Sequence, residues 1–185
     1  MEELFEKILD KDEKIIKIFK PQKTKYFFSV LFSWGICLLF FALIGVCAVI
    51  FPDEGYVVDK SLLLVPIGGW VVSMLVVLLI ASIYYKNLYY AYSNKRIIIR
   101  SGVFGVDFKS LDMSMIGAVN VYVSLIDKIL RKNTGTILFG STASPLNYGQ
   151  TSGTCYKFTH IKMPYETCKE VKSYIDEYKK QLNGK

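Results

Sequence analysis

Two long runs of uncharged, mostly apolar residues constrain this chain more than any other feature of its sequence. The first run covers the 26 residues 26–51 and the second covers the 24 residues 62–85. A helix that crosses the hydrocarbon core of a bilayer needs about 20 such residues, so each run is long enough to span with some tilt. The remaining residues are too few to wrap both runs as buried core helices. The sequence therefore predicts a membrane protein with a two-helix transmembrane hairpin, whose spans are 26–51 and 62–85.

The charges on either side of the two runs predict the orientation of this hairpin. Residues 1–25 contain seven lysines, and residues 86–100 add four basic residues, whereas the linker 52–61 has three acidic residues against one lysine. Positively charged flanks stay on the cytoplasmic side of a membrane. We therefore expect a multi-pass protein of the cell (plasma) membrane with both termini in the cytoplasm. Neither run contains an ionisable Asp, Glu, Lys, Arg or His, which argues against an ion path through the hairpin itself.

The first 25 residues form a basic N-terminal segment that we treat as separate from the rest of the cytosolic part. Leu4, Phe5, Ile8 and Leu9 follow a helical period, which predicts a short amphipathic helix. This helix could lie in the membrane interface or pack on the cytosolic domain. Residues 14–21 have a more extended pattern and could form a strand that ends at Pro21.

Residues 86–185 are expected to form a cytosolic α+β domain with a bent antiparallel sheet. Their pattern of alternation and turns predicts six strands, at 88–92, 95–100, 103–111, 116–123, 135–140 and 156–162. The period then changes to that of a helix that begins near Pro164 and has an apolar stripe at Cys168, Val171, Ile175, Tyr178 and Leu182. We expect this single C-terminal helix to cover one face or open end of the sheet.

Three segments carry a resemblance to a known family. They are "SNKRIIIRSG" at 93–102, "IGAVNVYVSLIDKILRKNTGTIL" at 116–138 and "FTHIKMP" at 158–164, followed by the closing helix. Their order resembles the bacterial pleckstrin-homology-like (PH-like) domain of small membrane proteins, in which two spans often precede the domain. The resemblance covers the whole chain in layout and about residues 88–182 in motif, with Ser93 where the family tends to have Thr. It implies no catalytic residues, and it does not bring the phosphoinositide ligand of other PH folds with it.

The residues offer little chemistry. The sequence contains no H-E-x-x-H, G-x-S-x-G or Walker A motif. The single histidine, His160, lies on an expected strand, and the four cysteines form no C-x-x-C pair. Asp107, Asp112 and Asp127 are too scattered to suggest a metal site. We therefore expect no enzyme, no cofactor, no nucleic-acid partner and no small-molecule substrate.

Basic residues on the cytosolic domain are the remaining candidates for a functional site. Residues 86–185 carry 15 Lys and Arg against 7 Asp and Glu. Two groups are candidates for contact with anionic lipid headgroups: Lys95, Arg96, Arg100 and Lys128, Arg131, Lys132. The alternative is that these charges only keep the domain solvated.

Two hypotheses about function follow. The first is a non-enzymatic module, anchored at the inner leaflet, whose sheet edge or loops bind a partner protein or further copies of the chain. The second is a component that senses anionic lipid or envelope stress through membrane lipids, and an accessory subunit of a transporter is a further alternative.

Overall fold

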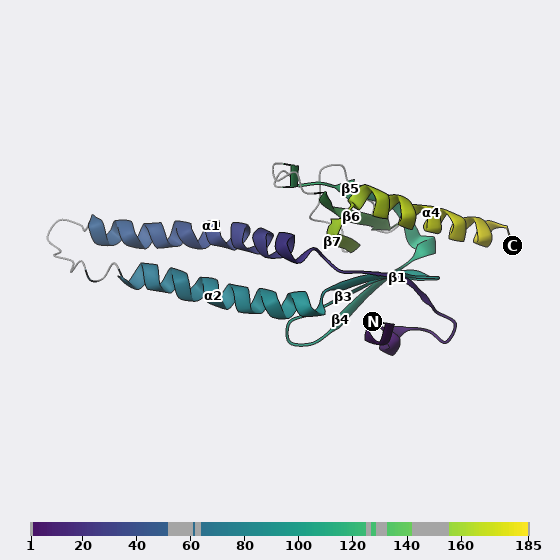
Figure 1. Ribbon diagram of the computed structural model, residues 1–185, viewed down its shortest axis with the longest axis horizontal. Coiled ribbons are helices and arrows are strands. Elements are labelled where there is room, and N and C mark those ends of the chain that lie inside the picture. Colours follow the sequence, from purple (N-terminus) through teal and green to yellow (C-terminus); the bar gives the residue numbers. More distant parts are fainter. Residues whose placement is uncertain are drawn as a thin grey trace. The chain divides into compact units, whose positions relative to one another are not determined.

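A computed structural model describes residues 2–51, 61, 64–124, 127–128, 133–141 and 156–184 of the chain. Its contacts divide the chain into two compact units, one formed by residues 26–86 and the other by residues 1–25 together with 87–185. We call these the apolar unit and the mixed unit, and describe each by itself (Figure 1). The N-terminal segment thus shares its contacts with the C-terminal half of the chain.

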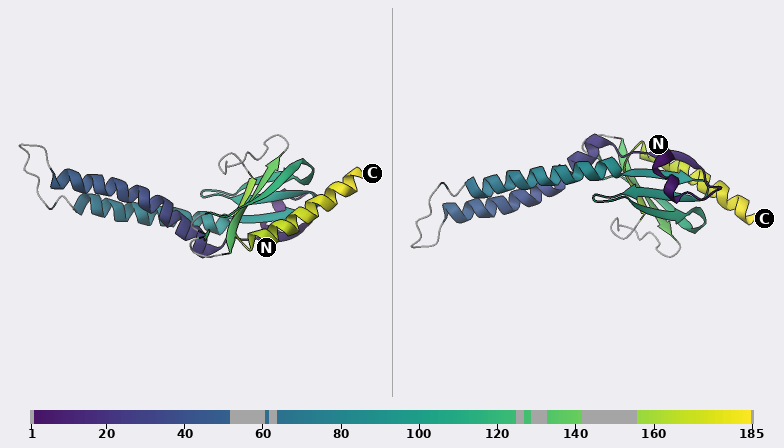
Figure 2. Two further views of the ribbon diagram at one scale, coloured as in Figure 1. Left: turned by 90° about the horizontal axis from the view of Figure 1, so that it is seen from above. Right: turned by 90° about the horizontal axis from the view of Figure 1, so that it is seen from below.

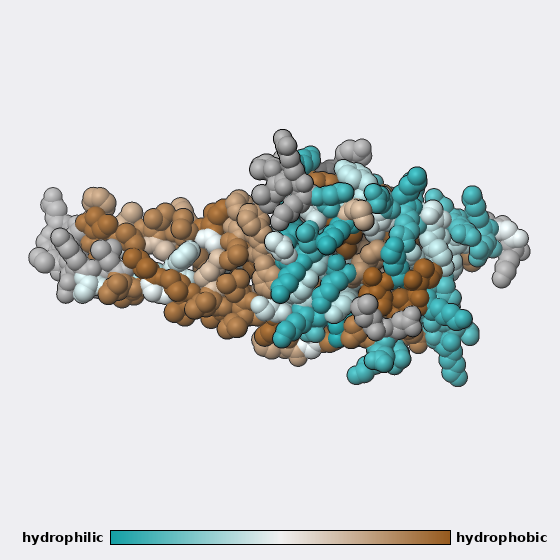
Figure 3. Space-filling view, viewed as in Figure 1, coloured by the Kyte–Doolittle hydropathy of each residue, from teal (hydrophilic) through white to brown (hydrophobic). Residues whose placement is uncertain are grey.

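The apolar unit is built from two helices, α1 (Lys23–Ile50) and α2 (Leu64–Asn87). Both have a mean hydropathy of 2.5 and bury almost none of their side chains within the protein, and both are long and apolar enough to cross a membrane. The apolar surface along these helices is brown in Figure 3. Close approach of the helices occurs at Gly35, where an added Cβ would lie 3.3 Å from Met74, and at Gly45, where it would lie 2.9 Å from Pro66.

The first residues of the mixed unit differ from what the sequence predicted. The expected N-terminal helix is replaced by two short 3-10 turns, η1 (Glu2–Leu4) and η2 (Glu6–Ile8), and the strand β1 (Ile15–Phe19) follows them. Phe5 between the turns is fully buried against Ala91 and Ile98. Figure 2 shows these turns lying against the strands, and the buried side chain of Phe5 packs them onto the sheet.

Strand β1 is part of a four-stranded antiparallel sheet whose order is β1-β2-β3-β4. The other strands are β2 (Tyr89–Ser93), β3 (Arg96–Ser101) and β4 (Asp107–Asp112). Strand β4 begins four residues later than expected, because residues 102–106 form the turn between β3 and β4. Gly102 has φ +144°, and a Cβ there would lie 2.1 Å from the Gly105 carbonyl oxygen, so this turn requires glycine.

The pairing of β1 with β2 determines how the chain is arranged. Phe19 is the register partner of Tyr90, although α1 and α2 lie between them in the sequence. The two apolar helices are therefore inserted into the connection between the first two strands of one sheet. The mixed unit is a single fold that the chain leaves after Lys25 and re-enters at Asn87.

A second, three-stranded antiparallel sheet has the order β5-β6-β7. Its strands are β5 (Ile116–Tyr122), β6 (Thr134–Ser141) and β7 (Tyr156–Lys162). Helix α4 (Pro164–Asn183) lies along this sheet in Figure 1 and buries Val171 and Ile175 in its stripe, while Leu182 at its end is exposed. The expected C-terminal helix is thus present, and the expected sheet consists of two sheets.

The core of the mixed unit lies between these sheets and includes Tyr90, Phe139 and Phe158, with ring centroids 4.8 Å apart in each neighbouring pair. Strand β3 is buried on both faces, since Ile97, Ile98 and Ile99 are all buried. A strand of an antiparallel sheet commonly has one face on the core and the other in water. The N-terminal turns cover that second face, which explains three consecutive isoleucines in one strand.

Candidate functional site

The end of the mixed unit at which the chain leaves and returns contains several polar contacts. We call it the insertion end and define it by residues 20–25, 87–89 and 100–102. Strand β2 starts here and β3 finishes here, because Tyr89 is the register partner of Arg100. The turn 93–95 between these strands therefore lies at the opposite end of the unit.

A buried ion pair joins the first turn of α1 to the segment after β5. Lys25 Nζ lies 2.6 Å from Asp127 Oδ1, and their side chains are 3% and 5% exposed. Asp127 also accepts hydrogen bonds from Ser124 Oγ at 2.6 Å and Thr134 Oγ1 at 2.5 Å. Burial raises the pKa of Asp127, but the Lys25 charge and the two hydroxyl donors outweigh it, so the pKa lies below its ordinary value. The carboxylate is therefore ionised at neutral pH and holds the lysine in place.

His160 lies on a bulge of β7 beside this pair. Its φ of +57° is unusual for a residue other than glycine, and the register of β6 and β7 shifts between Gly135 and Ile137 at this point. The bulge lets the His160 carbonyl accept a hydrogen bond of 2.8 Å from the backbone N–H of Gln22, just before α1. Burial, together with the Lys25 charge, lowers the pKa of the imidazole. His160 is therefore neutral at pH 7 and supports the start of α1.

Two basic side chains pack against the Tyr89 ring at the insertion end. Lys20 Nζ lies 4.4 Å from the centroid of the Tyr89 ring and donates to its hydroxyl at 2.9 Å. The Arg100 guanidinium lies 5.7 Å from the same centroid and donates from Nη1 to the Asn87 carbonyl at 3.3 Å. The Asn87 amide in turn donates to the Gly102 carbonyl at 3.1 Å. Aromatic and basic groups are thus packed together where the chain leaves the unit.

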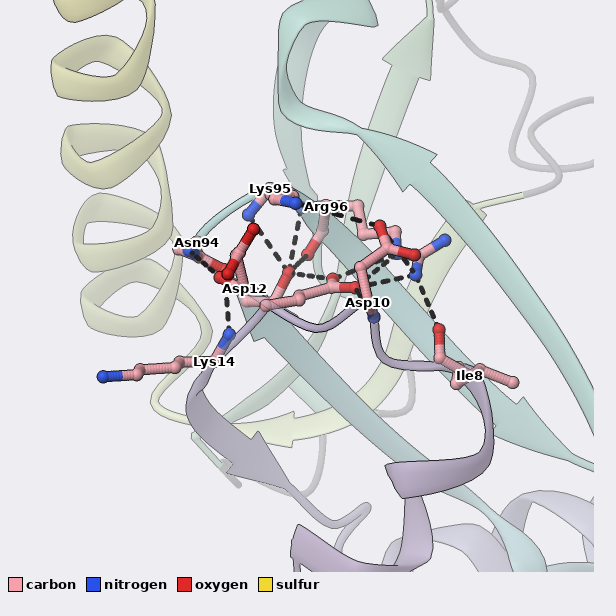
Figure 4. A network of polar contacts seen from close by, with 9 residues as sticks. Ile8, Asp10, Asp12, Lys14, Asn94, Lys95 and Arg96 are labelled. Atoms are coloured by element: carbon pink, nitrogen blue, oxygen red, sulfur yellow. Dashed lines mark hydrogen bonds and ion pairs between the residues drawn. The ribbon is translucent and has the colours of Figure 1, made fainter.

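A different network occupies the opposite end (Figure 4). Arg96 makes hydrogen bonds through Nε and Nη2 to the Glu13 carboxylate at 2.7 to 3.2 Å, and a further one from Nη2 to the Ile8 carbonyl at 2.7 Å. Ser93 Oγ donates to Glu13 at 2.5 Å. Asn94 adds reciprocal bonds with Lys14, from the Lys14 N–H to Asn94 Oδ1 and from the Asn94 N–H to the Lys14 carbonyl. These contacts fix the N-terminal segment to the β2–β3 turn.

In this second network Glu13 and Arg96 each favour the charged form of the other. The Glu13 side chain is fully buried and the Arg96 side chain is 21% exposed. Burial raises the pKa of Glu13, but the hydrogen bonds from Arg96 and Ser93 lower it by a larger amount. The pKa of Glu13 therefore lies below its ordinary value. The pKa of Arg96 is raised, chiefly by its hydrogen bonds to Glu13. Arg96 therefore serves as the internal partner of a buried carboxylate.

The structure separates the basic residues that the sequence suggested as one hairpin group. Lys95 and Arg96 lie at the turn, whereas Arg100 lies at the insertion end, about 13 Å further along the strand at about 3.3 Å per residue. Lys95 lines a hollow of about 480 Å³ together with Tyr174 and Glu177 of α4. Lys128 is exposed and follows Asp127, and Arg131 and Lys132 lie outside the described residues. As headgroup contacts, all six remain predictions.

A groove runs between the outer strand of the second sheet and α4. It has a volume of about 250 Å³ and is lined by residues 116–120 of β5 and by Lys172, Ile175, Asp176 and Lys179 of α4. Among the described strands, β5 pairs with β6 alone. Gly117, Ala118 and Asn120 are exposed, so the strand presents backbone with little side-chain cover. Such an edge can accept another extended segment.

The described residues offer few groups for catalysis. Among them, no group of three or more His, Cys, Asp or Glu side chains could hold a metal ion. Burial raises the pKa of the Cys168 thiol, which disfavours the reactive thiolate form. Cys37 and Cys47 are exposed on α1, and neither forms a disulfide with a cysteine in the described part of the chain.

A four-stranded and a three-stranded antiparallel sheet, closed by one C-terminal helix, define a PH-like domain, here with two apolar helices inserted in its first connection. The family model described as "Bacterial PH domain" matches residues 31–181, which is well over half of the chain. The chain belongs to the bacterial PH domain family. Comparisons with curated proteins and with solved structures gave no match.

Several residues of these two ends were not singled out from the sequence. Lys25 counted only as a charge beside the first apolar run, and Asp127 only as a scattered acid. Glu13 lies among lysines in a segment that looked solvated. The one local signal was the run of three isoleucines at 97–99, which indicates a strand buried on both faces and hence a cover for the second face.

Proposed function

We propose that this chain is a membrane-anchored, non-enzymatic PH-like module that binds an extended protein segment at the inner leaflet of the cell membrane. In this proposal α1 and α2 span the bilayer, and both termini are cytoplasmic. The seven lysines of residues 1–25 and the acidic linker 52–61 support that orientation. The segment bound could belong to a partner protein or to a second copy of the chain.

The edge of β5 is the observation that carries this proposal. None of its seven residues is charged. Natural proteins protect open edges with charged side chains, and β4, at the edge of the other sheet, follows this rule with Asp107, Lys109 and Asp112. An uncharged edge beside a groove is therefore suited to pairing with another strand rather than to repelling it.

The groove also suggests the chemistry of the bound segment. Lys172 and Lys179 line it from α4 against the single carboxylate of Asp176. Lys179 Nζ already donates to the Ile116 carbonyl, so this lysine closes one end of the edge and leaves residues 117–122 open. We expect an extended segment with small side chains toward β5 and at least one acidic side chain toward α4.

Photo-crosslinking in native membranes tests this function. The full chain would carry a benzophenone amino acid at Asn120, and the adducts would be identified by mass. We expect a discrete adduct, at twice the chain mass for self-assembly or at another defined mass for a partner. Adding Ala118→Lys should abolish the adduct, because a charge on the edge opposes strand pairing.

The matched control is Ser110→Lys, which adds the same charge to the exposed and already charged edge β4. It should leave the adduct unchanged. A chain without any adduct at Asn120, or an adduct that survives Ala118→Lys, would count against the β5 groove as the binding surface.

A second candidate function, the sensing of anionic lipid, is favoured by the insertion end. Arg100 and Lys20 gather there around Tyr89, and each basic residue close to an anionic surface contributes about 1 kcal/mol to attraction. Of the four predicted headgroup contacts that the structure describes, Arg100 is therefore the most suitable. Arg96 is the least suitable, because Glu13 engages its guanidinium. Reconstitution of the full chain in vesicles with and without anionic lipid tests this. Protease sensitivity of the mixed unit that does not change with lipid charge would exclude it.

A further inference from the structure

The turn between β3 and β4 is an unusual surface feature of the insertion end. Phe104 at its tip is fully exposed and Val106 is 39% exposed. Residues 101–106 contain no charged side chain. Phe104 and Val106 together give the turn an apolar surface, and such a surface surrounded by polar residues marks contact with a partner or a membrane.

Hydrogen bonds fix this turn to the point where the chain returns from α2. The Asn87 amide donates to the Gly102 carbonyl at 3.1 Å, and Arg100 Nη1 donates to the Asn87 carbonyl at 3.3 Å. Asn87 is the last residue of α2. If α2 crosses a bilayer, Asn87 lies where the helix emerges, and the turn is held at the level of the lipid headgroups.

The surroundings of the turn match the composition of a membrane interface. Tyr89 is half-buried and carries Lys20 and Arg100 against its ring. Tyrosine is enriched at headgroup depth, and long basic side chains place their charge beside lipid phosphates while their stems cover apolar surface. Gly102 allows the φ of +144° that the turn requires, and a side chain there would clash with the Gly105 carbonyl.

We propose that the β3–β4 turn is a lipid-binding wedge that inserts Phe104 between the headgroups of the leaflet from which α2 emerges. Val106 extends its apolar surface, and Arg100 faces the phosphates. This inference rests on the proposed membrane anchor but not on the β5 groove. The wedge would determine how the PH-like unit is oriented on the membrane, since the insertion end would be held at two places, by the helices and by the turn.

Fluorescence quenching in lipid nanodiscs tests this wedge with the full chain. Trp34 and Trp70 are the two tryptophans and both lie on the apolar helices. In a Trp34→Phe/Trp70→Phe background, Phe104→Trp provides a single probe. We expect its emission to be quenched several-fold more strongly by lipids brominated on the acyl chain than by aqueous iodide.

Lys95→Trp in the same background is the matched control, because Lys95 lies at the opposite end of the β2–β3 hairpin. Iodide should quench it, and brominated lipid should not. Phe104→Trp that is quenched by iodide alone, or by neither reagent as in contact with a protein, overturns the wedge.

The chain with its two natural tryptophans separates failure of the wedge from failure of the anchor. Brominated lipid should quench Trp34 and Trp70 if α1 and α2 span the bilayer. If it quenches them but not a tryptophan at position 104, only the wedge is wrong. If it quenches none of them, the membrane anchor and the wedge both fail.

Discussion

At the scale of single residues, the mixed unit contains a buried ion pair at each of its two ends. Glu13 pairs with Arg96 near the β2–β3 turn, and Asp127 pairs with Lys25 at the insertion end. A buried pair of this kind contributes little compared with well-packed apolar residues, but the loss of one partner leaves an uncompensated charge. Each pair therefore makes the fold sensitive to the identity of a single side chain.

Replacement of Arg96 tests this directly. Arg96→Met should destabilise the mixed unit by about 3 to 5 kcal/mol, since Glu13 would stay buried without its partner. The double variant Glu13→Gln/Arg96→Met should recover part of that loss. Denaturant unfolding of the full chain in detergent, followed by near-ultraviolet circular dichroism, would measure both. Equal stability of the single and double variants would contradict the coupling.

Stability should also depend on pH, and the sign follows from the pKa directions. The pKa values of Glu13 and Asp127 are lowered in the folded state, and so is that of His160. The folded chain therefore binds fewer protons than the unfolded chain, and stability present at neutral pH is lost as the pH falls below the ordinary values of these groups. Asp127→Asn should be less stable at about pH 7 but should lose less stability between about pH 7 and pH 3. If the free energy of unfolding of Asp127→Asn falls as steeply with pH as that of the natural chain, the pH dependence comes from other groups.

At the scale of elements, the N-terminal segment is a structural part of the sheet. Strand β1 pairs with β2, and the turns before it cover Ala91 and Ile98 with Phe5. The ring of Phe19 adds contacts to Tyr92 and Phe158, with centroids 6.1 Å away in both cases. A segment that looks like a basic tail in the sequence thus supplies an edge strand and the cover of one face.

A pair of phenylalanine substitutions tests the role of this segment. Phe5→Ala should destabilise the mixed unit by about 3 to 5 kcal/mol, because it removes a fully buried ring and leaves a cavity. Phe104→Ala removes the same ring from a fully exposed position and should leave stability unchanged. Thermal unfolding of both variants in detergent would compare them. A Phe5→Ala variant as stable as Phe104→Ala would show that the N-terminal turns are dispensable.

At the scale of the whole molecule, two apolar helices interrupt the PH-like fold between its first and second strands. The two parts of the mixed unit, residues 1–25 and 87–185, must come together before β1 can pair. A hairpin of helices that returns the chain to the same end meets this requirement. We infer that the pair of apolar helices is inserted in the domain rather than attached to one terminus of it.

Excision of the hairpin tests this arrangement. A chain in which a short Gly/Ser linker replaces residues 26–86 should fold as a water-soluble domain with cooperative unfolding. Residues 86–185 alone lack β1 and the Phe5 cover, so they should remain largely unfolded or aggregate. Circular dichroism and size-exclusion chromatography would distinguish the two. A folded, monomeric 86–185 fragment would contradict the shared fold.

The sequence by itself determined the features that depend on neighbouring residues. The length of the two apolar runs predicted two long apolar helices, and the period of residues 164–183 predicted the C-terminal helix. Alternation identified β7 with its exact bounds and β5 and β6 within two residues. The strand predicted at 103–111 began too early, because residues 103–106 belong to the turn before β4. These elements follow from side-chain period and turn chemistry, which are local properties.

Only the tertiary structure decided which distant residues meet. The pairing of Phe19 with Tyr90, the ion pair of Lys25 with Asp127 and the position of Arg100 beside Asn87 all join segments that are far apart or oppositely directed in the chain. Glu13 and Arg96 looked like solvated charges in the sequence. Their burial depends on the segments that cover them, and composition does not show which segments these are. Long-range strand pairing and the desolvation of charges are properties of the assembled fold, and no local pattern encodes them.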